Sequence, residues 1–311
     1  MVTQTTNEYL VPKELHGARV DKAALTLVTN VSRAQMKRAI ADGAVRVNGK
    51  RRPKGAVVSE GEVITIVADA VAAKDGPAIP EPDAPLRVVF ESAGVVVVDK
   101  PAGQPSAPLL DGETGTLANA LVGRYPELAS VGYSPREPGL LHRLDTDTSG
   151  LLVAARTPEA FERLKAGLKA DRLQKSYLLV CREADLPDHG TIEFPIASHP
   201  KDQRRVYACV HPRDVARYSP RPAKTTYSVE RRGPKWAIVR VEVARALRHQ
   251  IRVHFAAIDH PLAGDILYGG EAVALGHHAL HAARVAFDDA ELGFDVGAPL
   301  PAATEALVLE S

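Results

Sequence analysis

Apolar positions in the first part of the chain repeat at helical spacing. Residues 20–28 place apolar side chains three and four positions apart, which predicts a short amphipathic helix. A second apolar set at residues 36–40 follows Ser32 and Gln35, whose spacing is that of a capping box at a helix N-terminus. Gly43 suits the C-terminal cap of this helix. The pattern therefore predicts two short consecutive helices.

After this pair the pattern changes from helical to alternating. Val45 and Val47 flank a polar residue as in a half-buried strand, and Asn48-Gly49 is a strong signal for a tight hairpin turn. A last strand is expected at residues 63–67. Two helices followed by a small hairpin-rich sheet predict a separate α/β domain over residues 13–68.

Residues 69–84 (DAVAAKDGPAIPEPDA) differ in composition from the segments on either side. They hold three prolines and several alanines, with a net negative charge and no apolar period. Such a segment is typical of a semi-rigid, exposed linker. We therefore expect a second, larger domain over residues 85–311.

The larger domain contains more strand-like than helical segments. A helix is expected after Thr157-Pro158, where a capping residue precedes a first-turn proline, and another over residues 248–258. Successive strands with scattered helices predict an α+β fold with a mixed or antiparallel sheet rather than a doubly wound one. The apolar runs typical of strands are residues 95–98, 151–155, 177–181, 226–229 and 237–243.

Composition is that of an ordinary globular protein and limits the function classes. Apolar residues make up 45% and charged residues 25% of the chain, and the formal net charge is +1. No apolar run approaches the length of a membrane span, and residues 1–15 lack the apolar core of a signal peptide. Two cysteines are too few for a disulfide framework. We expect a cytoplasmic protein.

The near-neutral total hides an uneven distribution of charge. Residues 13–67 hold eleven Lys or Arg against five Asp or Glu, whereas residues 288–311 hold six acidic residues and no Lys or Arg. A basic module of this kind attracts phosphates. A well-solvated charged surface accounts for the same asymmetry equally well.

The basic module resembles the RNA-binding domain first known from ribosomal protein S-four. The resemblance rests on residues 17–22 (GARVDK), 32–33 (SR) and 43–50 (GAVRVNGK). It implies that the second helix and the hairpin present basic side chains to structured RNA, through phosphate and shape contacts. The matching side chains are those of Arg33, Lys37, Arg38, Lys50 and Arg51.

The segment 141–153 (LHRLDTDTSGLLV) is the motif with the clearest chemistry. Asp145 comes where an apolar stretch opens into a small polar turn, so its carboxylate is expected to be half desolvated and still reachable. An aspartate at a turn also has an ordinary structural role, which is to accept backbone N–H bonds. Asp147 suits that structural role better than Asp145 does.

The whole of this string resembles the signature of the RluA-type pseudouridine synthases. His142 and Ser149 distinguish it from the related small-subunit type, which usually has Gly and Glu there. Further matches extend the resemblance over about residues 86–303. They are residues 97–103 (VVDKPAG), 175–177 (KSY), 223–227 (AKTTY), 249–254 (HQIRVH), 260–265 (HPLAGD) and 280–282 (LHA).

The resemblance implies that the protein isomerises uridine to pseudouridine in RNA after flipping the base. Asp145 then acts either as a nucleophile or as the base that starts glycal formation. Arg252 is the cation that keeps this carboxylate ionised, and Tyr177 lies against the uracil and is a candidate to take the proton from C5. Arg143, next to His142 in the RNA-binding part of the site, fills the space that the flipped nucleotide leaves. Ile251 either covers the other face of the uracil or belongs to the core.

The resemblance implies an RNA partner, with ribosomal RNA favoured over tRNA, and a monomeric enzyme. The reaction needs no cofactor, and His277, His278 and His281 lack ligand partners at metal-site spacing. The chain departs from the family at residues 245–248 (RALR), where Thr-Gly-Arg-Thr is usual. Residues 199–224 are rich in Lys and Arg and are expected to form a long exposed loop, either solvated or against the RNA.

Two rival functions belong to other classes. One is an RNA-binding or ribosome-assembly protein that has kept the fold and lost the activity, which the altered 245–248 segment favours. The other is a glycosidase-like hydrolase that uses Asp145 with Asp147. Two carboxylates so close around a turn are poorly placed to flank a scissile bond.

Overall fold

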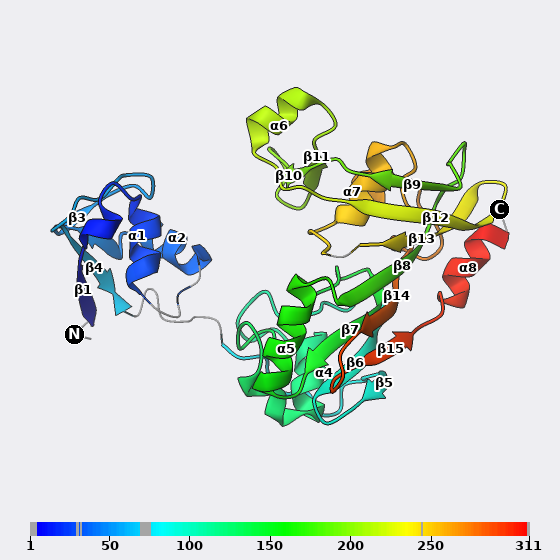
Figure 1. The fold of residues 1–311 in the computed structure, drawn as a ribbon, viewed down its shortest axis with the longest axis horizontal. Helices are drawn as coiled ribbons and strands as arrows, with labels where there is room; N and C mark the ends of the chain where they lie inside the picture. Colours follow the sequence, from blue (N-terminus) through cyan, green and yellow to red (C-terminus); the bar gives the residue numbers. More distant parts are fainter. Residues whose placement is uncertain (1–4, 29–30, 32, 69–75, 244, 310–311) are drawn as a thin grey trace. The chain divides into compact units, whose positions relative to one another are not determined.

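The computed structural model describes residues 5–28, 31, 33–68, 76–243 and 245–309. The chain divides into two compact units, Met1–Gly76 and Pro77–Ser311, which are considered separately below (Figure 1). Within the described residues, no helix has the length and apolar character needed to cross a membrane.

The N-terminal unit packs two helices on a four-stranded sheet. The buried side chains of Met36, Ile64 and Ile66 form the centre of its core, so each expected element contributes its apolar face. The sheet has the strand order β1-β4-β2-β3. The elements are β1 (Thr6–Leu10), η1 (Lys13–Leu15), α1 (Val20–Leu27), α2 (Arg33–Ala41), β2 (Val45–Val47), β3 (Lys50–Arg51) and β4 (Val63–Val67).

The expected start of this domain at residue 13 leaves out strand β1. This strand pairs antiparallel with β4 along its whole length. Its alternation is weak in the sequence because only Tyr9 is half-buried and its other side chains are exposed. Ser32, the expected capping residue of α2, lies outside the described residues.

The expected linker is wrong for its second half, which packs on the larger unit. Asn119 of α4 (Leu117–Arg124) donates its amide to the carbonyl of Ile79 at 2.8 Å, and Glu81 donates its backbone N–H to the carbonyl of Asn119 at 3.1 Å. These contacts are mostly backbone hydrogen bonds, so they leave no apolar period in the sequence. Residues 69–75 lie outside the described part of the chain.

A mixed sheet forms the larger unit, and the α+β expectation is confirmed. Among the described residues its strand order is β5-β6-β7-β14-β8-β13-β12-β9, with β15 added to β14. Strands β7 and β14 are parallel, and the other neighbouring pairs are antiparallel. The strands are β5 (Val88–Glu91), β6 (Val95–Lys100), β7 (Ser149–Ala155), β8 (Leu173–Arg182), β9 (His189–Ile192), β12 (Thr225–Arg232), β13 (Trp236–Glu242), β14 (Leu280–Phe287) and β15 (Phe294–Gly297).

Helices cover both faces of this sheet. Side chains of α4 and α7 (Gln250–Ala257) pack on one face, and those of α5 (Pro158–Lys169) and α8 (Ala302–Leu309) pack on the other. Residues of the central strands are therefore buried whichever face they point to, as Val95 and Val96 are. Burial on both sides explains why central strands such as β6 and β7 appear in the sequence as continuous apolar runs.

The expected long loop at residues 199–224 instead contains secondary structure. Strand β11 (Val206–Ala208) pairs with β10 (Ile196–Ser198), and α6 (Pro212–Tyr218) follows. The backbone N–H of Val206 also donates to the hydroxyl of Tyr268 at 2.9 Å. A contact between residues so far apart in sequence leaves no local signal, which is why this order was missed.

Candidate active site

The site begins at the central seam of the sheet, where β7 and β14 run side by side. Gly150, at the start of β7, has a φ of +111°, and a Cβ there would lie 2.4 Å from the carbonyl oxygen of Ala282. Only glycine allows two backbones to approach so closely. Gly150 therefore fixes where the chain passes from the segment with Asp145 into β7.

The segment before Asp145 is held by a side chain rather than by a strand ladder. Ser106 donates its hydroxyl to the carbonyl of Leu144 at 2.7 Å and accepts the backbone N–H of Leu144 at 3.1 Å. The leucines are buried as expected, but residues 141–148 form no strand. On the C-terminal side, the backbone carbonyl of Asp145 accepts the backbone N–H of Thr148 at 3.0 Å. The aspartate is thus fixed on both sides.

The buried side chain of Lys100 supports this segment. Its ammonium group is fully buried and donates to the carbonyl oxygens of Pro101, Gln104 and Thr146 at 2.9, 2.7 and 2.9 Å. Burial lowers the pKa of this amine to about 8, against the opposing charges of Asp147 and Asp145. Lys100 therefore joins the end of β6 to the turn after Asp145.

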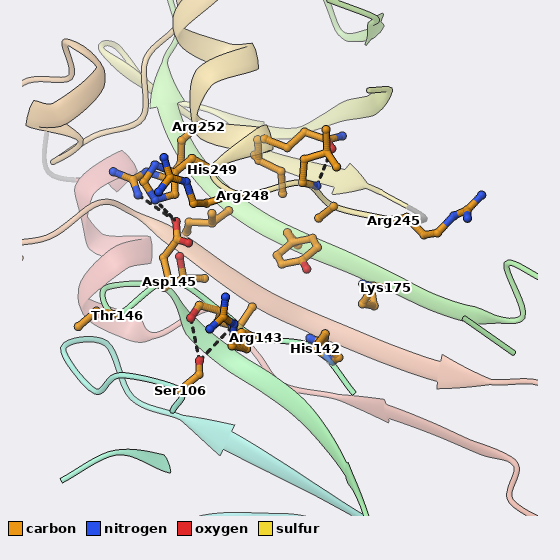
Figure 2. A pocket seen from close by; sticks show the side chains of 18 of the residues that line it. Ser106, His142, Arg143, Asp145, Thr146, Lys175, Arg245, Arg248, His249 and Arg252 are labelled. Carbon is orange, nitrogen blue, oxygen red and sulfur yellow. Dashed lines mark hydrogen bonds and ion pairs between the residues drawn. The ribbon is translucent and has the colours of Figure 1, made fainter. Parts of the chain in front are cut away.

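Arg252 connects Asp145 to a second, deeper carboxylate. Its Nε and Nη2 donate to the two oxygens of Asp265 at 2.7 and 2.8 Å, and its Nη1 donates to Oδ2 of Asp145 at 2.9 Å. The Asp265 side chain is 1% exposed, whereas that of Asp145 is 26% exposed. The bidentate pair fixes the guanidinium, so Arg252 offers one remaining N–H edge to Asp145 (Figure 2).

His249 approaches the same carboxylate oxygen from another direction. Its Nε2 lies 3.7 Å from Oδ2 of Asp145, and its Nδ1 lies 2.9 Å from the hydroxyl of Tyr268. Burial lowers the pKa of His249; Asp145 opposes this shift, and Arg252 and Arg248 add to it. An uncharged imidazole therefore stands beside the carboxylate.

A cavity of about 620 Å³ opens over Asp145. Tyr177 of β8 and Ile251 of α7 line it, and both are almost fully buried. Burial, with the charge of Asp145, raises the pKa of Tyr177, so its phenol is protonated at neutral pH. Ile251 also packs in the main core. The volume is within the range of about 300–1,000 Å³ typical of small-molecule sites.

Two neighbouring side chains of the motif sit differently in this cavity. Arg143 is exposed and pairs with Glu137 at 3.0 Å, while the Nε2 of His142 is buried with no hydrogen-bond partner among the described residues. Burial, with the charge of Lys175, holds the pKa of His142 well below its usual value. Arg143 is thus the movable member of this pair.

The structure brings one expected set together around the cavity, and the other set belongs to the N-terminal unit. Asp145, Tyr177, Arg252, His142, Arg143 and Ile251 all line the cavity, and so does the departing segment 245–248. In that segment Arg248 donates to the carbonyls of Gln203 and Arg205 at 2.9 and 2.8 Å. The five basic residues of the expected RNA-binding set belong to the N-terminal unit, where all are exposed.

The C-terminal histidines have structural partners. His278 lies 2.8 Å from the hydroxyl of Thr148, and His281 lies 2.9 Å from that of Ser149. Among the described residues, no group of three or more His, Cys, Asp or Glu is arranged to hold a metal ion. These histidines therefore fix the strand that follows Asp145.

Comparisons with known proteins identify the family of this chain. A family model described as RNA pseudouridylate synthase matches residues 94–257, more than half of the chain. The chain belongs to the RNA pseudouridylate synthase family. It is therefore an enzyme that isomerises uridine in RNA to pseudouridine.

Bacterial relatives align with most of this chain. The ribosomal large subunit pseudouridine synthase D of Yersinia pestis is 35% identical over 272 residues, which are 87% of this chain and 78% of the relative. An uncharacterized RNA pseudouridine synthase of Aquifex aeolicus is 32% identical over 81% of this chain and 77% of its own. The human RNA pseudouridylate synthase domain containing 1 structure shares the fold, with a TM-score of 0.55 and 24% identity over 70% of this chain and 84% of that one.

Sequence reasoning missed five residues that shape this site. Lys100, His249 and Asp265 stood inside quoted motifs without a role, and Ser106 and Tyr268 stood outside any motif. The clearest signal was Lys100, a charged residue two positions after the apolar run 95–98 and directly before proline. The contacts of the other four join separate segments of the sequence.

Proposed function

We propose that this pseudouridine synthase modifies uridines of the large ribosomal RNA, with Asp145 as the reacting carboxylate. The observation that carries the proposal is the 2.9 Å ion pair between Asp145 and Arg252 on the cavity floor. An ion pair with a fixed guanidinium favours the charged carboxylate, and a charged oxygen is what either a nucleophile or a base requires. The ribosomal RNA target is supported by the printed name of the Yersinia relative.

The other cavity residues support a flipped uridine in this site. The ring of Tyr177 and the side chain of Ile251 offer apolar surfaces for the two faces of the base. Arg143 is exposed and needs to break only a surface pair with Glu137, worth about 0–1 kcal/mol, to fill the gap in the RNA. To accept the C5 proton, the Tyr177 phenol must first lose its own proton.

The position of Asp147 argues against the hydrolase alternative. The described residues that line the cavity include Asp145 and do not include Asp147. The charge of Asp147 favours the protonated form of buried Lys100. A two-carboxylate mechanism requires both groups to flank the scissile bond. The alternative of an inactive binding protein is disfavoured because Asp145, Arg252 and Tyr177 meet in one cavity despite the altered 245–248 segment.

We further propose that the N-terminal unit is an S-four-type RNA-binding domain, and that the enzyme acts as a cytoplasmic monomer. Arg33, Lys37 and Arg38 lie exposed on α2, and Lys50 and Arg51 lie exposed on β3. Arg51 also donates to the carbonyl of Asp42 at the end of α2, at 3.1 Å. This contact joins the helix and the strand into one basic surface, which suits phosphates of structured RNA.

Replacing Lys37 and Arg38 together by glutamine is expected to raise KM for RNA about tenfold and to leave kcat unchanged. The reason is that phosphate contacts contribute to affinity and not to the chemical step. The dependence of binding on salt should weaken by roughly one to two units of slope, measured by filter binding. The control variant, R231Q/K235Q, removes the same charge from the exposed β12–β13 hairpin. An unchanged KM in K37Q/R38Q would contradict the role of this surface.

The target is tested by mapping pseudouridine in ribosomal RNA and tRNA from cells that lack the protein. We expect at least one pseudouridine of the large ribosomal RNA to disappear and to return with the wild-type protein but not with D145N. A loss confined to tRNA would overturn the ribosomal target. Release of free uracil from RNA in vitro would support the hydrolase instead.

A further inference from the structure

His249 occupies a backbone conformation that costs free energy. Its φ is +53°, in the left-handed region that non-glycine residues rarely adopt, and it stands directly before α7. Gln250 stabilises this turn because its side chain accepts the backbone N–H of Leu247 at 2.9 Å. The chain thus maintains a strained position that directs this imidazole toward Asp145.

The partners of Tyr268 determine which nitrogen of His249 carries the proton. The Tyr268 oxygen already accepts the backbone N–H of Val206 at 2.9 Å, so its hydroxyl hydrogen is free to donate. Nδ1 of His249, at 2.9 Å, is within reach of that hydrogen as its acceptor. An imidazole that accepts at Nδ1 and is uncharged carries its hydrogen on Nε2. This Nε2–H is the atom that lies 3.7 Å from Oδ2 of Asp145.

We propose that the Nε2–H of His249 is an uncharged hydrogen-bond donor to the reacting nucleotide, and that Tyr268 positions it by fixing its tautomer. The separation of 3.7 Å from Asp145 is too long for a hydrogen bond, and Arg252 already donates to the same oxygen. His249 also lines the cavity. Its N–H is therefore directed at a ligand beside the carboxylate. The inference rests on the proposed role of Asp145.

Such a donor matches the charge that develops in this reaction. On either route the bond from C1′ of the ribose to N1 of uracil breaks, and its electron pair leaves on the uracil ring. The resulting anion spreads its charge over N1 and the two carbonyl oxygens. A fixed donor at that position stabilises the transition state more than the ground state, by about 10²- to 10³-fold in rate.

The surroundings of His249 favour the uncharged form. Arg252 of α7 and Arg248, the residue before His249, oppose protonation of His249. Asp145 and Asp265 favour it. From the neighbouring segments, Tyr268 and His278 face it, and Arg205 lies over the Tyr268 ring at 5.5 Å. A protonated His249 would pair with Asp145 and compete with Arg252 for its oxygen, so activity should fall as His249 gains a proton.

The test compares the two amide replacements of His249 in single-turnover tritium release from a large ribosomal RNA transcript labelled at C5 of uridine. Glutamine places an amide N–H near the position of Nε2, and asparagine places its amide near Nδ1. We expect H249N to lower kcat about 100-fold with little change in KM, and H249Q to recover at least a tenfold part of that loss. H189N, at an exposed histidine of β9, should equal the wild type.

Tyr268→Phe tests the positioning step through the pH profile. Without the donated hydrogen bond, Nδ1 accepts a proton more easily, so the acid-side fall in kcat should move to higher pH than in the wild type. In H249Q the titrating imidazole is absent, so adding Y268F should leave the acid limb unmoved. A general loosening of the fold would move neither limb selectively.

Three results would overturn the inference. These are a wild-type kcat in H249N, equal kcat in H249N and H249Q, or the same acid limb in Y268F as in the wild type. Circular dichroism and RNA affinity of each variant identify a folding failure. If H249N or Y268F fails to fold, the comparison of kcat in H249Q with the wild type decides whether an N–H donor at this position is sufficient. Failure of the proposed function is separate, because it would appear as activity that survives in D145N.

Discussion

Replacement of Asp145 by asparagine is expected to abolish tritium release from RNA labelled at C5 of uridine, with a loss of about 10⁴-fold or more. The amide has the shape of the carboxylate and can still accept the Nη1–H of Arg252, so the site should stay assembled. What disappears is the charged oxygen that attacks the ribose or removes its proton. A rate within tenfold of the wild type would remove Asp145 from the mechanism.

The stability of D145N should differ little from that of the wild type. Asp145 is 26% exposed, and Arg252 keeps its bidentate pair with buried Asp265 in the variant. We expect thermal unfolding within a few degrees of the wild type, because partly exposed ion pairs contribute only about 0–1 kcal/mol. D147N is the matched control, since Asp147 lies two positions away and outside the cavity lining among the described residues. It should retain most of the activity.

Most of the fold could be predicted from the sequence because its elements have local causes. Helix α5 begins where Thr157 caps it and Pro158 occupies its first turn. The central strands β6 and β7 are buried on both faces, so each appears as an apolar run. The packed segment around Ile79 and strand β11 escaped prediction because their partners, Asn119 and Tyr268, lie far away in sequence.

The site divides in the same way between local and distant contacts. Asp145 and Arg252 were predicted because each lies in a contiguous motif, and the structure brings them to 2.9 Å. The residues that hold them were not, because Lys100 reaches Thr146 and Ser106 reaches Leu144 across separate segments. A sequence motif names the side chains proposed to react, while the groups that position them emerge only when the sheet brings β6, β7 and β14 together.

Arg252 has two separable functions, and one set of variants distinguishes them. It neutralises the buried carboxylate of Asp265, which is 1% exposed, and it directs one N–H at Asp145. Its guanidinium also lies 5.2 Å from the Tyr268 ring. Arg252→Met removes both functions and leaves Asp265 as an unpaired buried charge. We expect a loss of about 3–5 kcal/mol in the free energy of unfolding, measured by urea denaturation, together with loss of tritium release.

The double variant R252M/D265N separates stability from catalysis. Removing the orphaned charge should restore most of the stability, because the penalty comes from an uncompensated carboxylate in the interior. It should not restore activity, because Asp145 in the cavity still lacks the positively charged N–H donor that Arg252 supplies. Arg252→Lys retains a charge but cannot bind Asp265 bidentately and reach Asp145 together, so it should keep partial stability and little activity. If R252M/D265N released tritium at the wild-type rate, Arg252 would be a purely structural residue.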